Sequence, residues 1–143
     1  MNAALIVGIL VAAGIATTVA SWFLTRRDFA KRFLSRPAMD VREALSEFAP
    51  DEVQFLATLW PRLEKNLGVP RGRLRLTDRF NVELQANPKL AIYHPAWEVI
   101  EDLQELLPRE PLNIGTIRDY CECALRLWRD SPSRHDLVKA ILG

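Results

Sequence analysis

The chain has 143 residues, with nineteen Lys and Arg against eighteen Asp and Glu and a net charge of +1. This length leaves room for one small domain beside the single long apolar run, and for little else. The charges are unevenly placed, because residues 26–36 form a basic neck of about +4 whereas the chain from residue 37 is slightly acidic. An acidic domain argues against nucleic-acid binding. The cluster of Arg71, Arg73, Arg75 and Arg79 lacks interleaved aromatic residues and predicts a solvated loop.

The uncharged run from Ala3 to Leu24 predicts a membrane anchor. At roughly 1.5 Å per helical residue it is long enough to cross the ~30 Å hydrocarbon core of a bilayer. A cleaved signal peptide would carry positive charge before the run and a small-x-small site after it, whereas here Met1 and Asn2 precede the run and the basic neck follows it. The positive-inside bias predicts a single-pass protein of the cell (inner) membrane, with its N-terminus outside and its C-terminal domain in the cytoplasm.

Two features of the N-terminal part suggest contacts. Small residues recur every fourth position in the anchor, so the helix could pack on a second copy and form a homodimer, although such residues are common in any membrane helix. In the neck, Phe29, Phe33 and Leu34 lie on one side of a helix and the cations on the other, which predicts a segment in the headgroup layer or a topology signal alone. Each cation contributes ~1 kcal/mol near anionic lipid. The packing residues are Gly8, Ala12 and Ala16, and the lipid-contact residues are Arg26, Arg27, Lys31 and Arg32.

From residue 38 to Gly143 the periodicity is helical, so we expect an all-α fold with an anchor over 1–24, a basic juxtamembrane segment over 25–37 and a helical domain over 38–143. Asp40 predicts the start of a short helix. A helix from Pro50 ends at Gly68, and Pro61 should kink or divide it. A long loop follows over 68–87, held by apolar residues: Leu74, Leu76, Phe80, Val82 and Leu84.

Pro95 suits the first position of the next helix, which has the clearest amphipathic pattern in the chain. Its predicted core face carries Trp97, Ile100, Leu103 and Leu107. Its other face is acidic, with Glu98, Glu101, Asp102 and Glu105.

Thr116 with Asp119 predicts the start of another helix, whose inner face carries Ile117, Tyr120, Cys121, Ala124 and Trp128. Ser133 with Asp136 predicts a last, short helix that presents Leu137, Val138, Ile141 and Leu142.

The segment from about residue 51 to 129 resembles the acyl carrier protein family. The resemblance is carried by the helix ending in Leu67-Gly68-Val69, by Asn81-Val82-Glu83-Leu84 before the acidic helix, and by Ile114-Gly115-Thr116-Ile117 before the next one. In that family, phosphopantetheine is attached to a Ser at the start of the acidic helix, which would fall between Pro88 and Pro95. This chain has no Ser between Ser46 and Ser131. The resemblance therefore implies a carrier-like domain without its prosthetic group, and Tyr93 and His94 are not expected to replace the Ser.

In that family partner proteins recognise the acidic helix, so the resemblance predicts a non-catalytic, membrane-tethered module that docks a partner protein through the acidic face. The alternative is a small membrane structural or assembly protein that associates through its anchor. We expect no enzyme, because the chain offers no recognisable catalytic triad or phosphate-binding loop. We expect no cofactor or metal either, since Cys121 and Cys123 lack the partners of a zinc site. Cys121 should be buried and Cys123 partly exposed. The aromatic residues Trp60, Phe80, Trp97, Tyr120 and Trp128 should form the core, or else part to admit a lipid chain.

Overall fold

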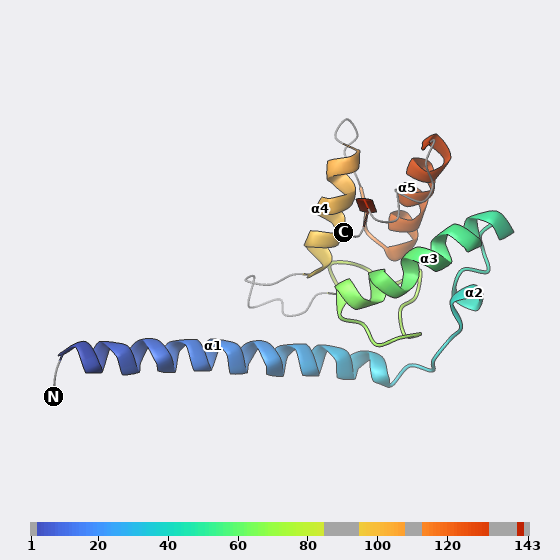
Figure 1. The fold of residues 1–143 in the computed structure, drawn as a ribbon. Helices are drawn as coiled ribbons and strands as arrows, with labels where there is room; N and C mark the ends of the chain where they lie inside the picture. The colour runs from blue at the N-terminus through green and yellow to red at the C-terminus, as the bar shows by residue number, and fades with distance from the viewer. Residues whose placement is uncertain (1–2, 85–94, 108–112, 132–139, 142–143) are drawn as a thin grey trace.

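The structure is a computed structural model that describes residues 3–84, 95–107, 113–131 and 140–141. The fold is all-α, as the periodicity predicts (Figure 1). Its elements are α1 (Ala3–Leu34), α2 (Val41–Ala44), α3 (Pro50–Leu67), α4 (Pro95–Leu106) and α5 (Ile117–Asp130). Within the described ranges the only extended pairing is an isolated antiparallel bridge between Arg79 and Thr116. The carrier-type attachment segment between Pro88 and Pro95 and the predicted cap at Ser133 lie outside the described residues, apart from the helical backbone of Pro95.

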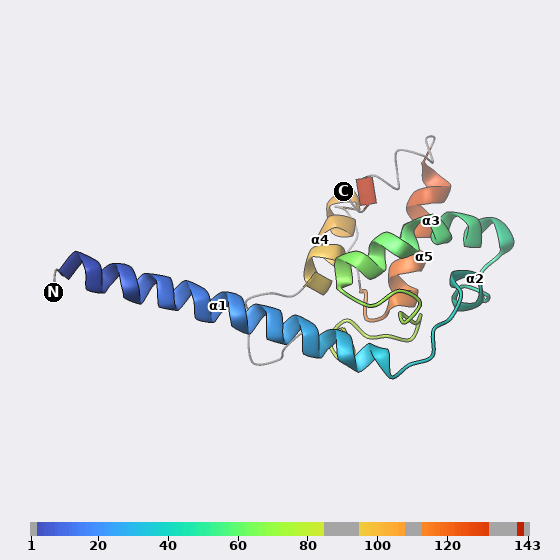
Figure 2. The ribbon, with the colours of Figure 1, turned by 60° about the horizontal axis from the view of Figure 1, so that its bottom comes forward.

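The first helix continues without interruption from the apolar run through the basic neck, and it extends as a single rod well beyond the bundle (Figures 1 and 2). It is long and apolar enough to cross a membrane by length and composition. Side chains of the apolar stretch are exposed, whereas Phe29 and Phe33, near the end of the rod, are only 3% and 2% exposed. The rod ends at Leu34, three residues before Pro37, whose ring disfavours a helical conformation in the residue that precedes it.

The third helix forms the centre of the bundle and contacts α2, α4 and α5. Pro50 begins it, and the Glu52 carboxylate accepts a hydrogen bond from the backbone N–H of Ala49 at 3.1 Å. Gly68 ends it in the left-handed conformation, as predicted. The helix is not divided at Pro61. Buried residues on both sides of the proline hold the two halves against one core: Phe55, Leu56, Leu59, Trp60, Leu63, Glu64 and Leu67.

The core face of α4 differs from the prediction. Ala96, Val99 and Leu103 are buried, whereas Trp97 is 57% exposed. Trp97 lies about 100° further around the helix than Ala96. The sequence pattern placed the core stripe over the large Trp97 side chain, but the small side chain of Ala96 allows the helix to pack closely one position earlier. Ile100 and Leu107 lie at the edge of the core, and Val82 in the preceding loop is exposed as well.

Local start signals of the other helices are confirmed. The Asp40 carboxylate accepts a hydrogen bond from the N–H of Arg42 at 2.8 Å. Thr116 and Asp119 form a capping box at the start of α5, in which the Thr116 hydroxyl accepts from the N–H of Asp119 and the Asp119 carboxylate accepts from that of Thr116. Both signals act within four residues of the chain, so they do not depend on distant packing.

Gly72 meets two conformational demands at once. Its φ is +73°, and a Cβ atom on it would lie 3.0 Å from the carbonyl oxygen of Met39. We expect Gly72→Ala to lower the free energy of unfolding by about 1–3 kcal/mol, measured by chemical denaturation in detergent, because the left-handed backbone and the contact both become strained. Gly115→Ala is the control, since its added Cβ meets nothing closer than 3.5 Å. Equal effects of the two substitutions would contradict this account.

Candidate functional site

The acidic face of α4 is the candidate docking surface. Glu98, Glu101, Asp102 and Glu105 are all exposed. They lie on the side of the helix away from Ala96, Val99 and Leu103, the residues that pack against the core. None of the four carboxylates forms an ion pair with another residue in the described part of the chain. The structure therefore gathers the four predicted carboxylates into one exposed surface.

Some carboxylates elsewhere in the domain are paired with arginine. Glu47, in the connection between α2 and α3, pairs with Arg118 of α5, and Glu52 of α3 pairs with Arg129 of α5. Glu83 pairs with Arg79 at 2.9 Å, and this hydrogen-bonded guanidinium lowers the pKa of Glu83 to about 2. The domain thus neutralises several of its acidic groups internally, while those of α4 remain available to solvent or to a partner.

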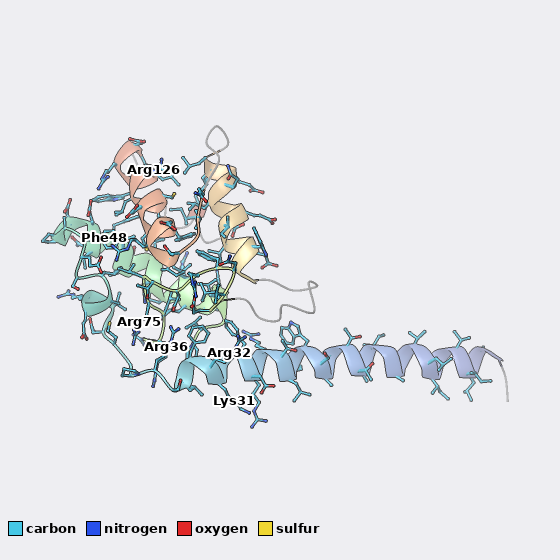
Figure 3. The ribbon with its side chains drawn as sticks, turned by 180° about the vertical axis from the view of Figure 1, so that it is seen from behind. Lys31, Arg32, Arg36, Phe48, Arg75 and Arg126 are labelled. Carbon is cyan, nitrogen blue, oxygen red and sulfur yellow. The ribbon has the colours of Figure 1, made fainter. Side chains whose placement is uncertain are left out.

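The basic neck lies on the last turns of α1, and its four predicted lipid-contact residues are exposed. The guanidinium groups of Arg26 and Arg32 lie over the rings of Trp22 and Phe29, at 5.3 and 5.1 Å from the ring centroids. Figure 3 shows Lys31 pointing away from the domain. The cations are therefore placed where headgroups could reach them if the apolar stretch lies in a bilayer.

The apolar side of the neck packs largely on the domain, which the sequence did not predict. Phe29 and Phe33 are buried in the domain core, and Phe29 lies against Gly68 at the end of α3. Only Leu34 of the three predicted apolar residues is exposed. The domain offers these aromatic rings a packed apolar environment, so they join its core instead of covering lipid.

The end of α1 is fixed by a buried ion pair with the loop that follows α3. The Arg36 guanidinium donates to both carboxylate oxygens of Asp78, at 2.7 and 2.8 Å. The Asp78 carboxylate also accepts from the backbone N–H of Arg75 at 2.9 Å, and the Asp78 carbonyl accepts from that of Ile117 at 3.0 Å. One residue, 2% exposed, thus joins the end of α1, the loop and the start of α5.

Two loop arginines complete the contact between the end of α1 and the loop after α3. We define this contact region, residues 29–37 together with residues 68–78, as the junction. Arg73 donates to the carbonyl of Leu34 at 3.0 Å, and Arg75 donates to that of Pro37 at 2.6 Å. Figure 3 shows Arg36 and Arg75 on the domain side of α1. The prediction of a solvated loop is wrong for these two arginines. Arg73 binds the last carbonyl of α1, which needs a donor from outside the helix, and Arg75 binds a carbonyl of the segment that follows α1.

A second buried carboxylate holds the same loop against α3. Glu64 is 3% exposed, and its carboxylate accepts from the N–H of Gly72 at 2.8 Å. Burial raises the pKa of Glu64 above its ordinary value, and hydrogen bonds from Gly72, the Trp60 side chain and Leu74 oppose this shift in part. The carboxylate therefore organises the junction from the inside and is not placed for acid–base chemistry on an external substrate.

The two cysteines and Tyr120 are buried in the core. Cys121 and Cys123 are both buried, which corrects the expectation that Cys123 is partly exposed. Burial raises the pKa of Cys121 to about 12, so this thiol stays protonated. The buried Tyr120 hydroxyl has no hydrogen-bond partner in the part of the chain that the structure describes. Within the described residues no group of His, Cys, Asp and Glu could hold a metal ion.

The packing ridge on α1 is accessible. Gly8, Ala12 and Ala16 are exposed, and a Cβ atom on Gly8 would meet no other atom within 4 Å. The structure thus leaves this ridge available to a second helix without supplying one.

Comparison of the chain with protein-family models, with curated proteins and with solved structures gives no match. The resemblance to acyl carrier proteins stays a prediction. The candidate surface rests on the exposed carboxylates and on the junction that positions the domain.

Removing the Asp78 carboxylate should lower the stability of the whole domain. In Asp78→Ala the Arg36 guanidinium and the N–H of Arg75 lose their acceptor, and we expect a loss of about 3 kcal/mol in the free energy of unfolding. The matched control is Asp28→Ala, which removes an exposed ion pair with Lys31 at 3.5 Å and should cost less than about 1 kcal/mol. Chemical denaturation followed by circular dichroism measures both, and a small effect of Asp78→Ala would refute the central role of the pair.

Glu64 should make stability depend on pH. Because the pKa of Glu64 is raised in the folded chain, its contribution to stability is present below its ordinary pKa of 4.5 and is lost as the pH rises through the raised value. Gln at this position keeps an acceptor for the N–H of Gly72 but does not titrate. We therefore expect the stability of Glu64→Gln relative to the native chain to increase between about pH 4 and about pH 7. A constant difference across this range would contradict the assignment.

Proposed function

We propose that this protein is a membrane-tethered, non-catalytic binding module that docks a partner protein through the acidic face of α4. In this proposal α1 spans the cell (inner) membrane, with the N-terminus outside and the bundle in the cytoplasm. The observation that carries the proposal is the concentration of four exposed carboxylates on one face of a single helix. Several other carboxylates of the domain are paired with arginine, whereas the four on α4 are exposed on one face and form no ion pair within the described chain.

Such a face fits a partner with a basic surface. Opposite charges steer two proteins together and set their relative orientation, while they contribute less to the final affinity. Because these interactions are exposed, salt screens them beyond about 10 Å at ~0.1 M. The resemblance to acyl carrier proteins supports the same face, since partners of that family recognise the acidic helix.

The positive-inside bias supports the proposed topology. The exposed cations Arg26, Arg27, Lys31 and Arg32 directly follow the apolar stretch of α1, where such residues retain the following domain in the cytoplasm. The junction then holds α4 at a fixed position relative to the anchor, so a partner would meet the acidic face in a defined orientation near the membrane.

Charge reversal on α4 tests the docking proposal. We expect the full-length protein, purified from detergent-solubilised native membranes, to retain a specific co-purifying protein that is lost when Glu98, Glu101, Asp102 and Glu105 are changed to Lys. The capture should also weaken as salt is raised. The control changes four other exposed carboxylates to Lys and so has the same net charge: Glu43, Asp51, Glu122 and Asp130.

Identical profiles for the α4 variant and the native protein would refute docking through this face. The second candidate function, a structural or assembly protein that self-associates through α1, rests on the accessible ridge at Gly8, Ala12 and Ala16. In that case Gly8→Leu with Ala12→Leu would remove co-purification of two differently tagged copies, while charge reversal on α4 would leave it intact.

A further inference from the structure

The junction holds the domain in a fixed position relative to α1. Phe29 and Phe33 are buried in the domain core. The Arg36–Asp78 pair lies directly after the end of the helix, where Arg73 and Arg75 bind the carbonyls of residues 34 and 37. The connection from the apolar stretch to these residues is continuous helix without a linker. The direction of α1 through a membrane therefore also sets which side of the bundle faces that membrane.

The side that faces the apolar stretch of α1 is the one that carries the start of α4. In Figures 1 and 2, the N-terminal end of α4 is the described part of the bundle that reaches back furthest along α1, toward its apolar stretch. The helices that α4 packs against, α3 and α5, extend on its other side. The first turn of α4 thus lies at the level of the basic neck along the axis of α1.

A large aromatic side chain is exposed at this place. Trp97 lies in the first turn of α4 and is 57% exposed, whereas Trp60, Phe80, Tyr120 and Trp128 are buried. Tryptophan is enriched at the membrane–water interface, because its ring is apolar while its N–H can bind polar groups. Trp22, which precedes the neck on α1, would lie at the same boundary.

We propose that Trp97 inserts into the headgroup layer of the bilayer that α1 spans, so that the domain is held to the membrane at two points. The inference rests on the membrane insertion of α1 in the proposed function. Glu98 and Glu101 flank Trp97 and would be repelled by anionic lipid. The contact therefore fits zwitterionic headgroups, whose ammonium groups can approach both the carboxylates and the ring face.

Quenching of tryptophan fluorescence by brominated lipid tests the contact. Full-length Trp22→Phe protein is reconstituted into phosphatidylcholine vesicles, which leaves Trp97 as the exposed indole beside the buried Trp60 and Trp128. Bromine near the headgroup end of the acyl chain should remove about one third of the emission, because Trp97 is one of three remaining indoles. Bromine at the far end of the chain should remove much less.

The control is Trp22→Phe with Trp97→Phe, in which the quenching near the headgroup should disappear while circular dichroism shows the same helix content. Vesicle flotation separates the two proposals. Protein that fails to float has not inserted α1, which overturns both the membrane proposal and this inference. Protein that floats but keeps its emission with either brominated lipid overturns the Trp97 contact alone. Loss of partner capture in Trp97→Ala would then assign this side chain to protein docking.

Discussion

The Asp78 carboxylate is the interaction on which the arrangement of this protein depends. It accepts two hydrogen bonds from Arg36 and one from the backbone of Arg75, and the carbonyl of the same residue accepts from the first residue of α5. A carboxylate with 2% exposure is costly to bury unless each oxygen has partners, and here the partners come from three separate segments. The anchor, the loop and the last long helix are therefore ordered together.

This arrangement gives the basic neck a structural role in the domain. A basic amphipathic segment after a membrane span is commonly a flexible or surface-bound connection. In this protein its aromatic side belongs to the domain core, while its cations remain exposed. The two sides of one short helical segment thus lie in different environments, with Phe29 and Phe33 packed in the domain core and the cations exposed. The buried rings thus fix the position of the domain relative to the end of α1.

Glu64 shows how the loop of the junction keeps its shape. Its carboxylate lies under the turn at Gly72, where the backbone adopts a positive φ and approaches residue 39 closely. The loop has few regular backbone hydrogen bonds of its own, so buried side-chain acceptors replace them. Charged residues that look like surface groups in the sequence are in this way part of the internal framework, whereas those of α4 remain on the surface.

Local rules in the sequence determined the all-α class, the long apolar helix, the cap at Thr116 and Asp119 and the end of α3 at Gly68, because each depends on residues within a few positions of one another. The acidic surface of α4 also follows from spacing alone, since residues three and four apart share a face. Only the tertiary structure decided that Phe29 and Phe33 pack on the domain, that Arg73 and Arg75 bind the end of α1, and that Ala96 is buried instead of Trp97. In each case the same side chain could lie in either of two environments. Which one it occupies depends on residues that are distant in the sequence.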